Sequence, residues 1–241
     1  FLTIREPQRK IQESESIEVP SFSKVIQYIK NNWEVYGAII IGNSCLIILL
    51  YGLQSWVPTM LLRVYEWDLV QSGRVYGSIA MLAGSAGVLS GPFVLRYMSK
   101  INVNAPHFKL AIIGITMATF SLVLLPFQPN VNIALVFVTM ASFFVTLPLA
   151  GTSSAMVIVS PNRIRGVITG IYFVVTSVFG LVLGPFLVAS STDFIFQDTN
   201  AVAKSLALVS VLVGPVGIFF MFKGINSFGE MKNVHLNLPK E

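Results

Sequence analysis

The chain has 241 residues, of which 54% are hydrophobic and only 11% are charged, and its mean hydropathy is +0.74. Because soluble globular domains carry about 25% charged residues, this composition excludes an ordinary water-soluble domain. The net charge is +5, but most basic residues lie between apolar segments, which indicates membrane topology and not a nucleic-acid-binding face. The single cysteine, Cys45, excludes an intrachain disulfide.

Residues 1–34 precede the apolar segments and are predicted to form a cytoplasmic linker. The stretch REPQRKIQESESIEVPS (5–21) is highly charged and lacks a core pattern. Apolar residues at helical spacing follow it, namely Phe22, Val25, Ile26 and Ile29. They predict a short amphipathic helix on the membrane surface, although a solvated lead-in to the first span explains them equally well.

Six apolar stretches follow, each near the roughly 20 residues that a membrane-spanning helix needs. They are expected at 36–62, 69–95, 110–127, 131–159, 167–190 and 201–222. Asp68 is the expected N-cap of the second, and turn sequences containing Pro or Asn separate the later ones. The chain is therefore predicted to be an all-α membrane protein, with a six-helix bundle at 35–223 and a cytoplasmic tail at 224–241.

Basic residues are distributed unequally between the two sides of this topology. With the N-terminus inside, thirteen of the sixteen Lys and Arg residues fall in inside segments, and Arg63, Arg74 and Lys204 fall outside. Cytoplasmic loops carry the excess of basic residues in membrane proteins. Both termini of the chain are therefore predicted to be cytoplasmic.

Polar side chains recur on one face of the first, second, fourth and fifth spans, taking about 100° per residue. The faces comprise Asn43, Tyr51 and Gln54; Arg74, Ser78 and Ser85; Thr139, Ser142, Thr146 and Ser153; and Thr169, Tyr172 and Thr176. Polar groups in a span face protein or water, so these faces predict either a wet cavity or hydrogen bonds between packed helices. The third and sixth spans lack such a face and are expected to be lipid-facing or supporting.

Prolines and glycine pairs interrupt the spans. Pro148 lies in the middle of the fourth span, where a proline kinks a helix. Three glycine pairs have the spacing that lets helix backbones approach closely, at 87 and 91, 166 and 170, and 180 and 184. Kinked, closely packed helices with a polar interior suit a protein that rocks between two states.

The residues give no sign of an enzyme. The six expected spans contain no carboxylate, and the sequence has no phosphate-binding glycine loop, no HExxH motif and only two, distant histidines. Accordingly, no catalytic activity, cofactor, metal site or nucleic-acid partner is predicted.

Four stretches resemble the C-terminal half of a major facilitator superfamily transporter, particularly the bacterial spinster-like members. They are SWVPTMLLRVYEWDLVQSG (55–73), GPFVLRYMSK (91–100), SPNRIRGVITGIYF (160–173) and GLVLGPFLVASSTDFIF (180–196). The resemblance implies one six-helix bundle of a twelve-helix fold, whose cavity-lining helices would match the four spans with polar faces. It also implies a preceding N-terminal bundle, with FLTI (1–4) as the end of its last helix and the linker of 1–34 as the connection between the two bundles. The family's G-x-x-x-D-R loop is matched at Gly91 and Arg96 but has Leu95 in place of the Asp, which argues against a charge-relay role.

The expected function is secondary active transport, by alternating access, of a small organic solute that is anionic or amphiphilic. The expected substrate-cavity residues are Asn43, Tyr51, Gln54, Arg74, Ser78, Thr146, Ser153, Tyr172 and Thr176. Arg74 suits a cavity or gate, but it also suits a side chain that extends to the outer surface.

Gates are expected at both ends of the cavity. Trp56 and Pro58 would shape the outer gate, and the inner one would involve Gly91, Arg96, Arg163 and Arg165, whose charges also suit lipid phosphates. A proton or sodium ion is implied as coupling ion by the resemblance alone. The expected location is the bacterial inner membrane. Two alternatives stay open: a non-transporting assembly subunit, and a half-transporter that needs a partner bundle.

Overall fold

The computed structural model describes residues 21–237, so the part of the predicted linker before residue 21 lies outside the described residues. The described part consists of helices and their connections, without a strand. In chain order, the elements are α1 (Phe22–Asn31), α2 (Trp33–Val64), α3 (Leu69–Ile79), η1 (Ala80–Gly84), α4 (Ser85–Lys100), α5 (Pro106–Leu124), η2 (Leu125–Phe127), α6 (Val131–Thr146), α7 (Leu149–Val159), α8 (Arg165–Ser190), η3 (Ser191–Phe196) and α9 (Val202–Asn237).

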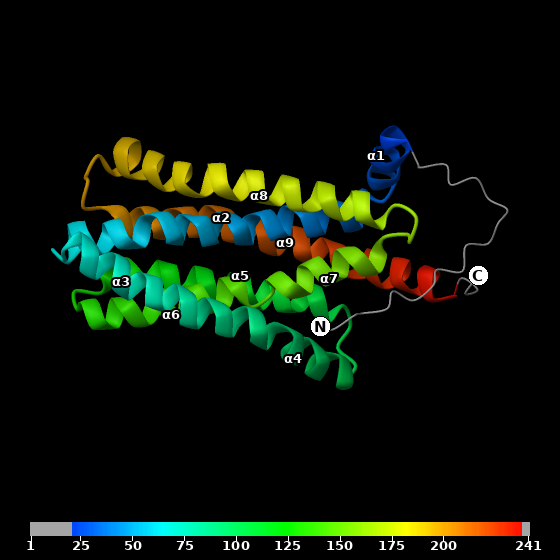
Figure 1. The fold of residues 1–241 in the computed structure, drawn as a ribbon, viewed down its shortest axis with the longest axis horizontal. Helices are drawn as coiled ribbons and strands as arrows, with labels where there is room; N and C mark the ends of the chain where they lie inside the picture. The colour runs from blue at the N-terminus through cyan, green and yellow to red at the C-terminus, as the bar shows by residue number, and fades with distance from the viewer. Residues whose placement is uncertain (1–20, 238–241) are drawn as a thin grey trace, which may run out of the picture.

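Six helical segments of the described part are long and apolar enough to cross a membrane, which confirms the predicted fold class. They are Trp33–Val64, Leu69–Lys100, Pro106–Phe127, Val131–Val159, Arg165–Phe196 and Val202–Gly229. They run side by side, and their connections alternate between the two ends of the bundle (Figure 1). Helix α1 lies at the end where α4 stops and α8 begins, on the side predicted to be cytoplasmic.

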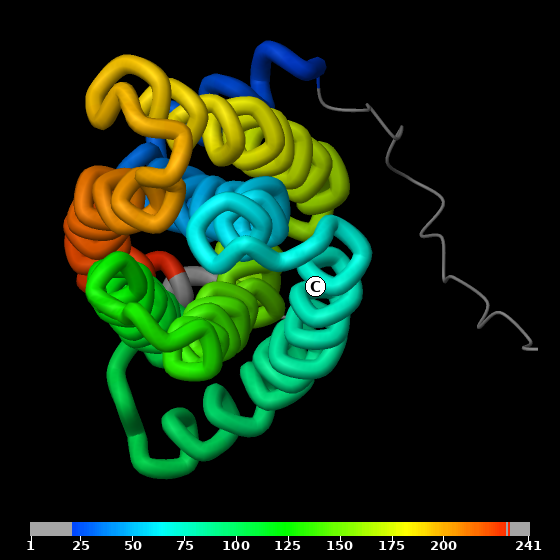
Figure 2. The backbone as a smooth tube through the Cα atoms, turned by 90° about the vertical axis from the view of Figure 1, so that its left-hand side faces the viewer, coloured from blue at the N-terminus to red at the C-terminus, as the bar shows by residue number. Residues whose placement is uncertain are grey.

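Helix α2 is the centre of the bundle, with α8 and α9 packed along it (Figure 2). Of its most apolar window, 78% is buried, because its apolar residues surround the whole helix. The corresponding windows of Leu69–Lys100 and Arg165–Phe196 are only 17% and 28% buried, whereas those of the third and sixth spans are 44% buried. The second and fifth spans are therefore the least covered within this bundle. The third and sixth, expected to be lipid-facing or supporting, are more covered by it.

Four spans depart from regular α-helix, the third only at its end, where η2 is a 3-10 helix. The second and fifth each contain a π-helical turn, η1 and η3. In the fourth, Pro148 separates α6 from α7, because proline has no N–H to bond to the carbonyl one turn earlier. Pro92 and Pro185, by contrast, lie within continuous α4 and α8.

The helix ends are held by contacts close to them. The Asp68 carboxylate accepts from the backbone N–H of Gln71 at 2.9 Å, which confirms the predicted N-cap of α3. At the same end, the Tyr65 hydroxyl donates to the carbonyl of Gln128 at 2.7 Å. Burial raises the pKa of the Tyr65 phenol, so it stays protonated and able to donate at neutral pH.

Helix α1 forms where the amphipathic pattern predicts it. Val25 and Ile29 are buried, and the helix contacts α2 and α8. Phe22, on the same side of the pattern, is 64% exposed. The apolar face of α1 is thus divided between the bundle and the outside, and its placement on a membrane surface stays a prediction.

Candidate transport cavity

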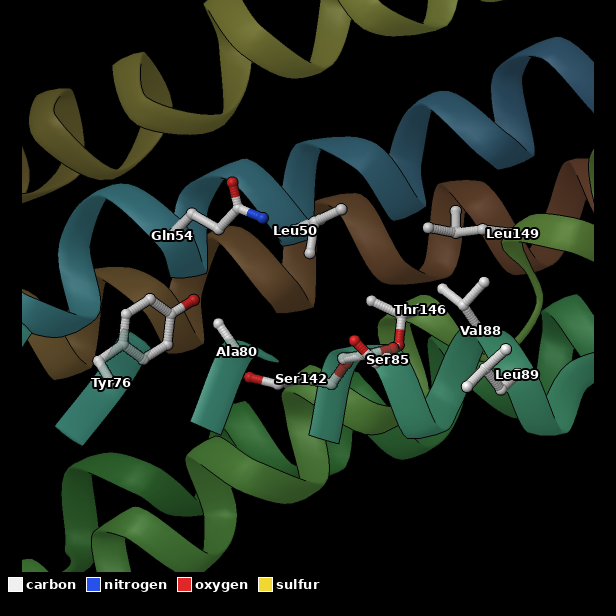
Figure 3. A pocket seen from close by; sticks show the side chains of 11 residues that line it. Leu50, Gln54, Tyr76, Ala80, Ser85, Val88, Leu89, Ser142, Thr146 and Leu149 are labelled. Atoms are coloured by element: carbon white, nitrogen blue, oxygen red, sulfur yellow. The ribbon is translucent and has the colours of Figure 1, made fainter. Parts of the chain in front are cut away.

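A cavity of about 470 Å³ lies between the first, second and fourth spans. Its lining residues are Leu50 and Gln54 of α2; Tyr76 of α3; Ala80 and Gly84 of η1; Ser85, Val88 and Leu89 of α4; Ser142 and Thr146 of α6; and Leu149 of α7 (Figure 3). Sites for small molecules typically measure 300–1,000 Å³. The cavity is therefore large enough for a small organic solute.

The cavity lies where two helices lose their regular hydrogen bonding. The π turn η1 forms its wall in the second span, and the break at Pro148 lies beside Leu149 in the fourth. The Thr146 hydroxyl, 3.0 Å from the carbonyl of Gly84, connects the two interrupted segments. Gly87 lets them approach, since a Cβ there would collide with Phe143 O and Thr146 Oγ1. Single π turns inside α-helices are frequent at functional sites.

The lining combines polar groups with an apolar majority and contains no charged side chain among the described residues. Its polar side chains are Gln54, Tyr76, Ser85, Ser142 and Thr146. Gln54 and Thr146 are the two expected cavity residues that the structure brings into this lining. Ser85 and Ser142 belong to the expected polar faces but were not expected cavity residues, and Tyr76 was missed.

Arg74 and Ser78 are exposed and absent from the lining. Ser78 donates its hydroxyl hydrogen to the carbonyl of Arg74 at 2.9 Å, within its own helix. The expected face of the second span fails because η1 adds a residue to one turn, which displaces the face before the turn relative to Ser85 after it. The helix face that does line the cavity passes through Tyr76, Ala80 and Gly84, which are spaced four residues apart.

Four other expected cavity residues lie in a buried polar cluster between α2, α7 and α8. Thr152 Oγ1 donates to Asn43 Oδ1 at 2.7 Å, and Tyr172 Oη lies 3.4 Å from Thr152 Oγ1. Ser153 Oγ lies 3.5 Å from Tyr172 Oη, and Thr176 donates to the Tyr172 carbonyl at 2.8 Å. In this structure Asn43, Ser153 and Tyr172 contact neighbouring helices, Thr176 bonds within its own helix, and none of the four lines the cavity.

Tyr51 is half-buried and likewise absent from the lining. A Cβ placed on Gly180 would lie 3.1 Å from its Cδ2 atom, and one placed on Gly184 would lie 3.1 Å from its Cβ. Tyr51 therefore packs between α2 and α8, where the two glycines leave room for it.

The expected outer-gate residues lie near the contact between α2 and α8. The Trp56 indole N–H donates to the carbonyl of Pro185 at 3.0 Å, and Pro58 is half-buried inside α2. Both partners of the Trp56 bond belong to this one bundle, so the bond braces two of its own helices.

Replacing Trp56 with phenylalanine is expected to lower the free energy of unfolding by about 1 kcal/mol, because one interhelical hydrogen bond is lost while the ring contacts largely remain. The measurement is denaturation by SDS in mixed micelles. Phe220→Leu, a matched aromatic change on α9, serves as the control for lost ring contacts. If the free energy of unfolding were the same in Trp56→Phe, the indole N–H would not stabilise the contact between α2 and α8.

The expected inner-gate residues are placed differently from one another. Gly91 packs against the backbone of α6, since a Cβ there would collide with the carbonyl of Leu147. Arg96 and Arg163 are exposed. Arg165 donates through Nε and Nη2 to the carbonyl of Ser160, at 3.3 and 3.2 Å, and so holds the turn that precedes α8.

Leu95, at the position of the family's Asp, is buried against Leu110 and Leu147. A carboxylate in this apolar cluster would be desolvated. The local packing thus accounts for leucine at this position.

The comparisons with known proteins agree with this architecture. The family model of the Major Facilitator Superfamily matches residues 1–185. The fold is similar to that of a bacterial homologue of the human lysosomal transporter Spinster, solved inward-facing and unoccupied, with a TM-score of 0.65 and 13% identity over 96% of this chain and 53% of that one. For the inward-facing, occupied structure the TM-score is 0.59, with 14% identity over 84% of this chain and 50% of that one. None of the curated proteins compared with the chain matches it.

Six apolar helices, of which the first, second and fourth spans line a cavity, define an integral membrane protein built like half of a transporter. The chain belongs to the major facilitator superfamily. It spans about half the length of the solved structures that it resembles.

Proposed function

We propose that the chain is the C-terminal half of a secondary active transporter that moves a small organic solute by alternating access. The observation that carries the proposal is the cavity of about 470 Å³ beside the interrupted second and fourth spans. An interrupted helix beside a binding cavity is a recurring feature of transporters. Each interruption gives its span a point at which it bends during the transport cycle.

A second six-helix bundle is the proposed partner of this one. The two least covered spans carry large exposed apolar side chains, among them Leu89 and Phe93 on α4 and Val174 and Phe179 on α8. Leu89 also lines the cavity, so the exposed face and the cavity adjoin. A bundle packed there would close the cavity from the side that this chain leaves open.

The proposed setting is the bacterial inner membrane with both ends of the chain in the cytoplasm. The support is the excess of basic residues at one end of the bundle, where α1 lies, which is the side that the positive-inside rule places in the cytoplasm. Among the residues that the structure describes, no carboxylate lines the cavity. We therefore place any residue that carries a coupling proton in the partner bundle, and a sodium ion is the alternative coupling ion.

Water access to the cavity tests this proposal against a non-transporting assembly subunit. In a Cys45→Ala background, Gln54→Cys and Ser85→Cys are expected to react with a membrane-impermeant thiol reagent in native membranes. Ala118→Cys, fully buried on α5 and outside the cavity, is the protected control, and Lys204→Cys, exposed at the start of α9, is the reactive one. If positions 54 and 85 were as protected as position 118 under all conditions, the transport proposal would be wrong.

A half-transporter that pairs with a second copy of itself is the remaining alternative. Crosslinking in native membrane separates the two cases by mass. An adduct of two copies of this chain through Leu89→Cys, in the same Cys45→Ala background, would favour self-pairing, and an adduct with a different six-helix segment would favour the transporter half.

A further inference from the structure

The hydroxyl of Ser142 is a buried polar group without a partner. Ser142 is 3% exposed, it lines the cavity from α6, and its Oγ atom makes no hydrogen bond within the described part of the chain. The other hydroxyl of this helix in the lining, that of Thr146, has carbonyl acceptors within 3.0 Å. An unbonded buried hydroxyl has already lost its hydration, so the Ser142 hydroxyl can bond to a ligand with little further loss.

Tyr76 and Gln54 place two further hydrogen-bonding groups around the same space. The Tyr76 hydroxyl belongs to the same cavity lining as the Ser142 hydroxyl, which makes no hydrogen bond with it. Gln54 offers both an amide donor and a carbonyl acceptor from α2 (Figure 3). Together the three side chains match a ligand group that both donates and accepts.

The other residues of the lining carry no charge, and most of them are apolar. Leu50, Val88, Leu89 and Leu149 form its aliphatic part, and none of the described lining residues is ionisable near neutral pH. An ionised group held here would lose hydration without gaining a countercharge from this wall. Arg74, an expected cavity residue whose charge would suit an anionic group, is exposed and does not line the cavity.

We propose that this wall binds an uncharged hydrogen-bonding group, such as a carboxamide or hydroxyl, through Ser142, Tyr76 and Gln54, with an aliphatic segment against the four apolar residues. The inference rests on the proposed transport cavity and specifies its substrate class. It replaces recognition of an anionic head group with recognition of a neutral one.

Three probes with one tail and different head groups test the inference: octanamide, octanoate and octylammonium at pH 7.4. The readout is protection of Ser85→Cys from the impermeant thiol reagent, in the full-length Cys45→Ala protein in native membranes. Octanamide is expected to protect at a concentration at least about tenfold lower than either ion, because the ions bring an unpaired charge to the wall. Labelling of Lys204→Cys controls for effects of the probes on the reagent or the membrane.

Removing the unbonded hydroxyl provides a second readout. Ser142→Ala is expected to raise the octanamide concentration for half-protection about fivefold to tenfold, the effect of one hydrogen bond, while the resistance of the ligand-free protein to SDS stays equal or increases. Ser121→Ala, whose hydroxyl donates to its own helix at Met117, is the matched control and is expected to leave protection unchanged.

The outcomes separate the two proposals. Equal or better protection by octanoate or octylammonium, or no protection by octanamide at a reactive Ser85→Cys, overturns the neutral-ligand inference and leaves the cavity standing. Unchanged protection in Ser142→Ala also overturns it. If Ser85→Cys never reacted, the cavity would not be open to water, and both proposals would be wrong.

Discussion

Replacing Gly184 with leucine is expected to destabilise the bundle by about 3 kcal/mol, the upper part of the usual range for overpacking. A Cβ on Gly184 would lie 2.7 Å from the carbonyl oxygen of Ile48 and 3.0 Å from the backbone nitrogen of Gly52. These are backbone atoms of the central helix α2 and cannot turn away as a flexible side chain does. The whole of α8 would have to move outward, which would also strain the bond from Trp56 to Pro185.

Gly170→Leu is the matched control for this change. Gly170 lies on the same helix, and a Cβ there would have no heavy atom within 4 Å. Because leucine favours helix more than glycine does, this variant is expected to be neutral or slightly more stable. The measurement is SDS denaturation of the 241-residue chain in micelles. A similar loss in both variants would show that α8 does not pack on α2 through Gly184.

Replacing Thr152 with valine is expected to lower the free energy of unfolding by about 1.5 kcal/mol. Valine keeps the shape of threonine but cannot donate to Asn43 Oδ1, which is buried and 2.7 Å from the lost hydroxyl. It also takes away the acceptor that lies 3.4 Å from Tyr172 Oη. Interhelical hydrogen bonds in membrane proteins average only about 0.6 kcal/mol, with a maximum near 1.7, so the expected loss lies near the upper limit because two groups are affected.

A double-mutant cycle separates this bond from general packing. Asn43→Leu alone is expected to cost little, because the freed Thr152 hydroxyl can donate to Leu149 O, which lies 3.0 Å away. The double variant Asn43→Leu/Thr152→Val is expected to be more stable than Thr152→Val, since removing both partners leaves no orphaned acceptor on Asn43. Additive losses in the cycle would mean that the two side chains do not interact.

The fold was predictable because a membrane allows few solutions. Backbone groups in lipid must be bonded internally, so apolar stretches as long as 36–62 or 131–159 can only be spanning helices. Short-range chemistry was equally readable, as the Asp68 cap shows. These features depend on residues close together in the sequence, and no knowledge of how the helices pack was needed to recognise them.

The cavity was less predictable because its lining depends on packing and on local departures from 100° per residue. Thr146 and Asn43 both looked like cavity residues, yet only Thr146 lines the cavity, while Asn43 bonds to Thr152 of α7. Arg74 attracted attention by its charge, whereas Tyr76, two residues later, faces the cavity. The spacing of residues alone did not indicate the π turn at Ala80–Gly84, which changes the face that the second span turns toward the cavity.

The π turn at Ala80–Gly84 has a consequence for tracing the ancestry of this chain. A turn closed by bonds from residue i to i+5 holds one residue more than an α-helical turn. A relative whose helix is regular at this point would therefore be one residue shorter here, and the two sequences would correspond only with a gap inside 80–84. Pairing them without the gap would compare helix faces that are rotated by about 100° from each other along all of α4.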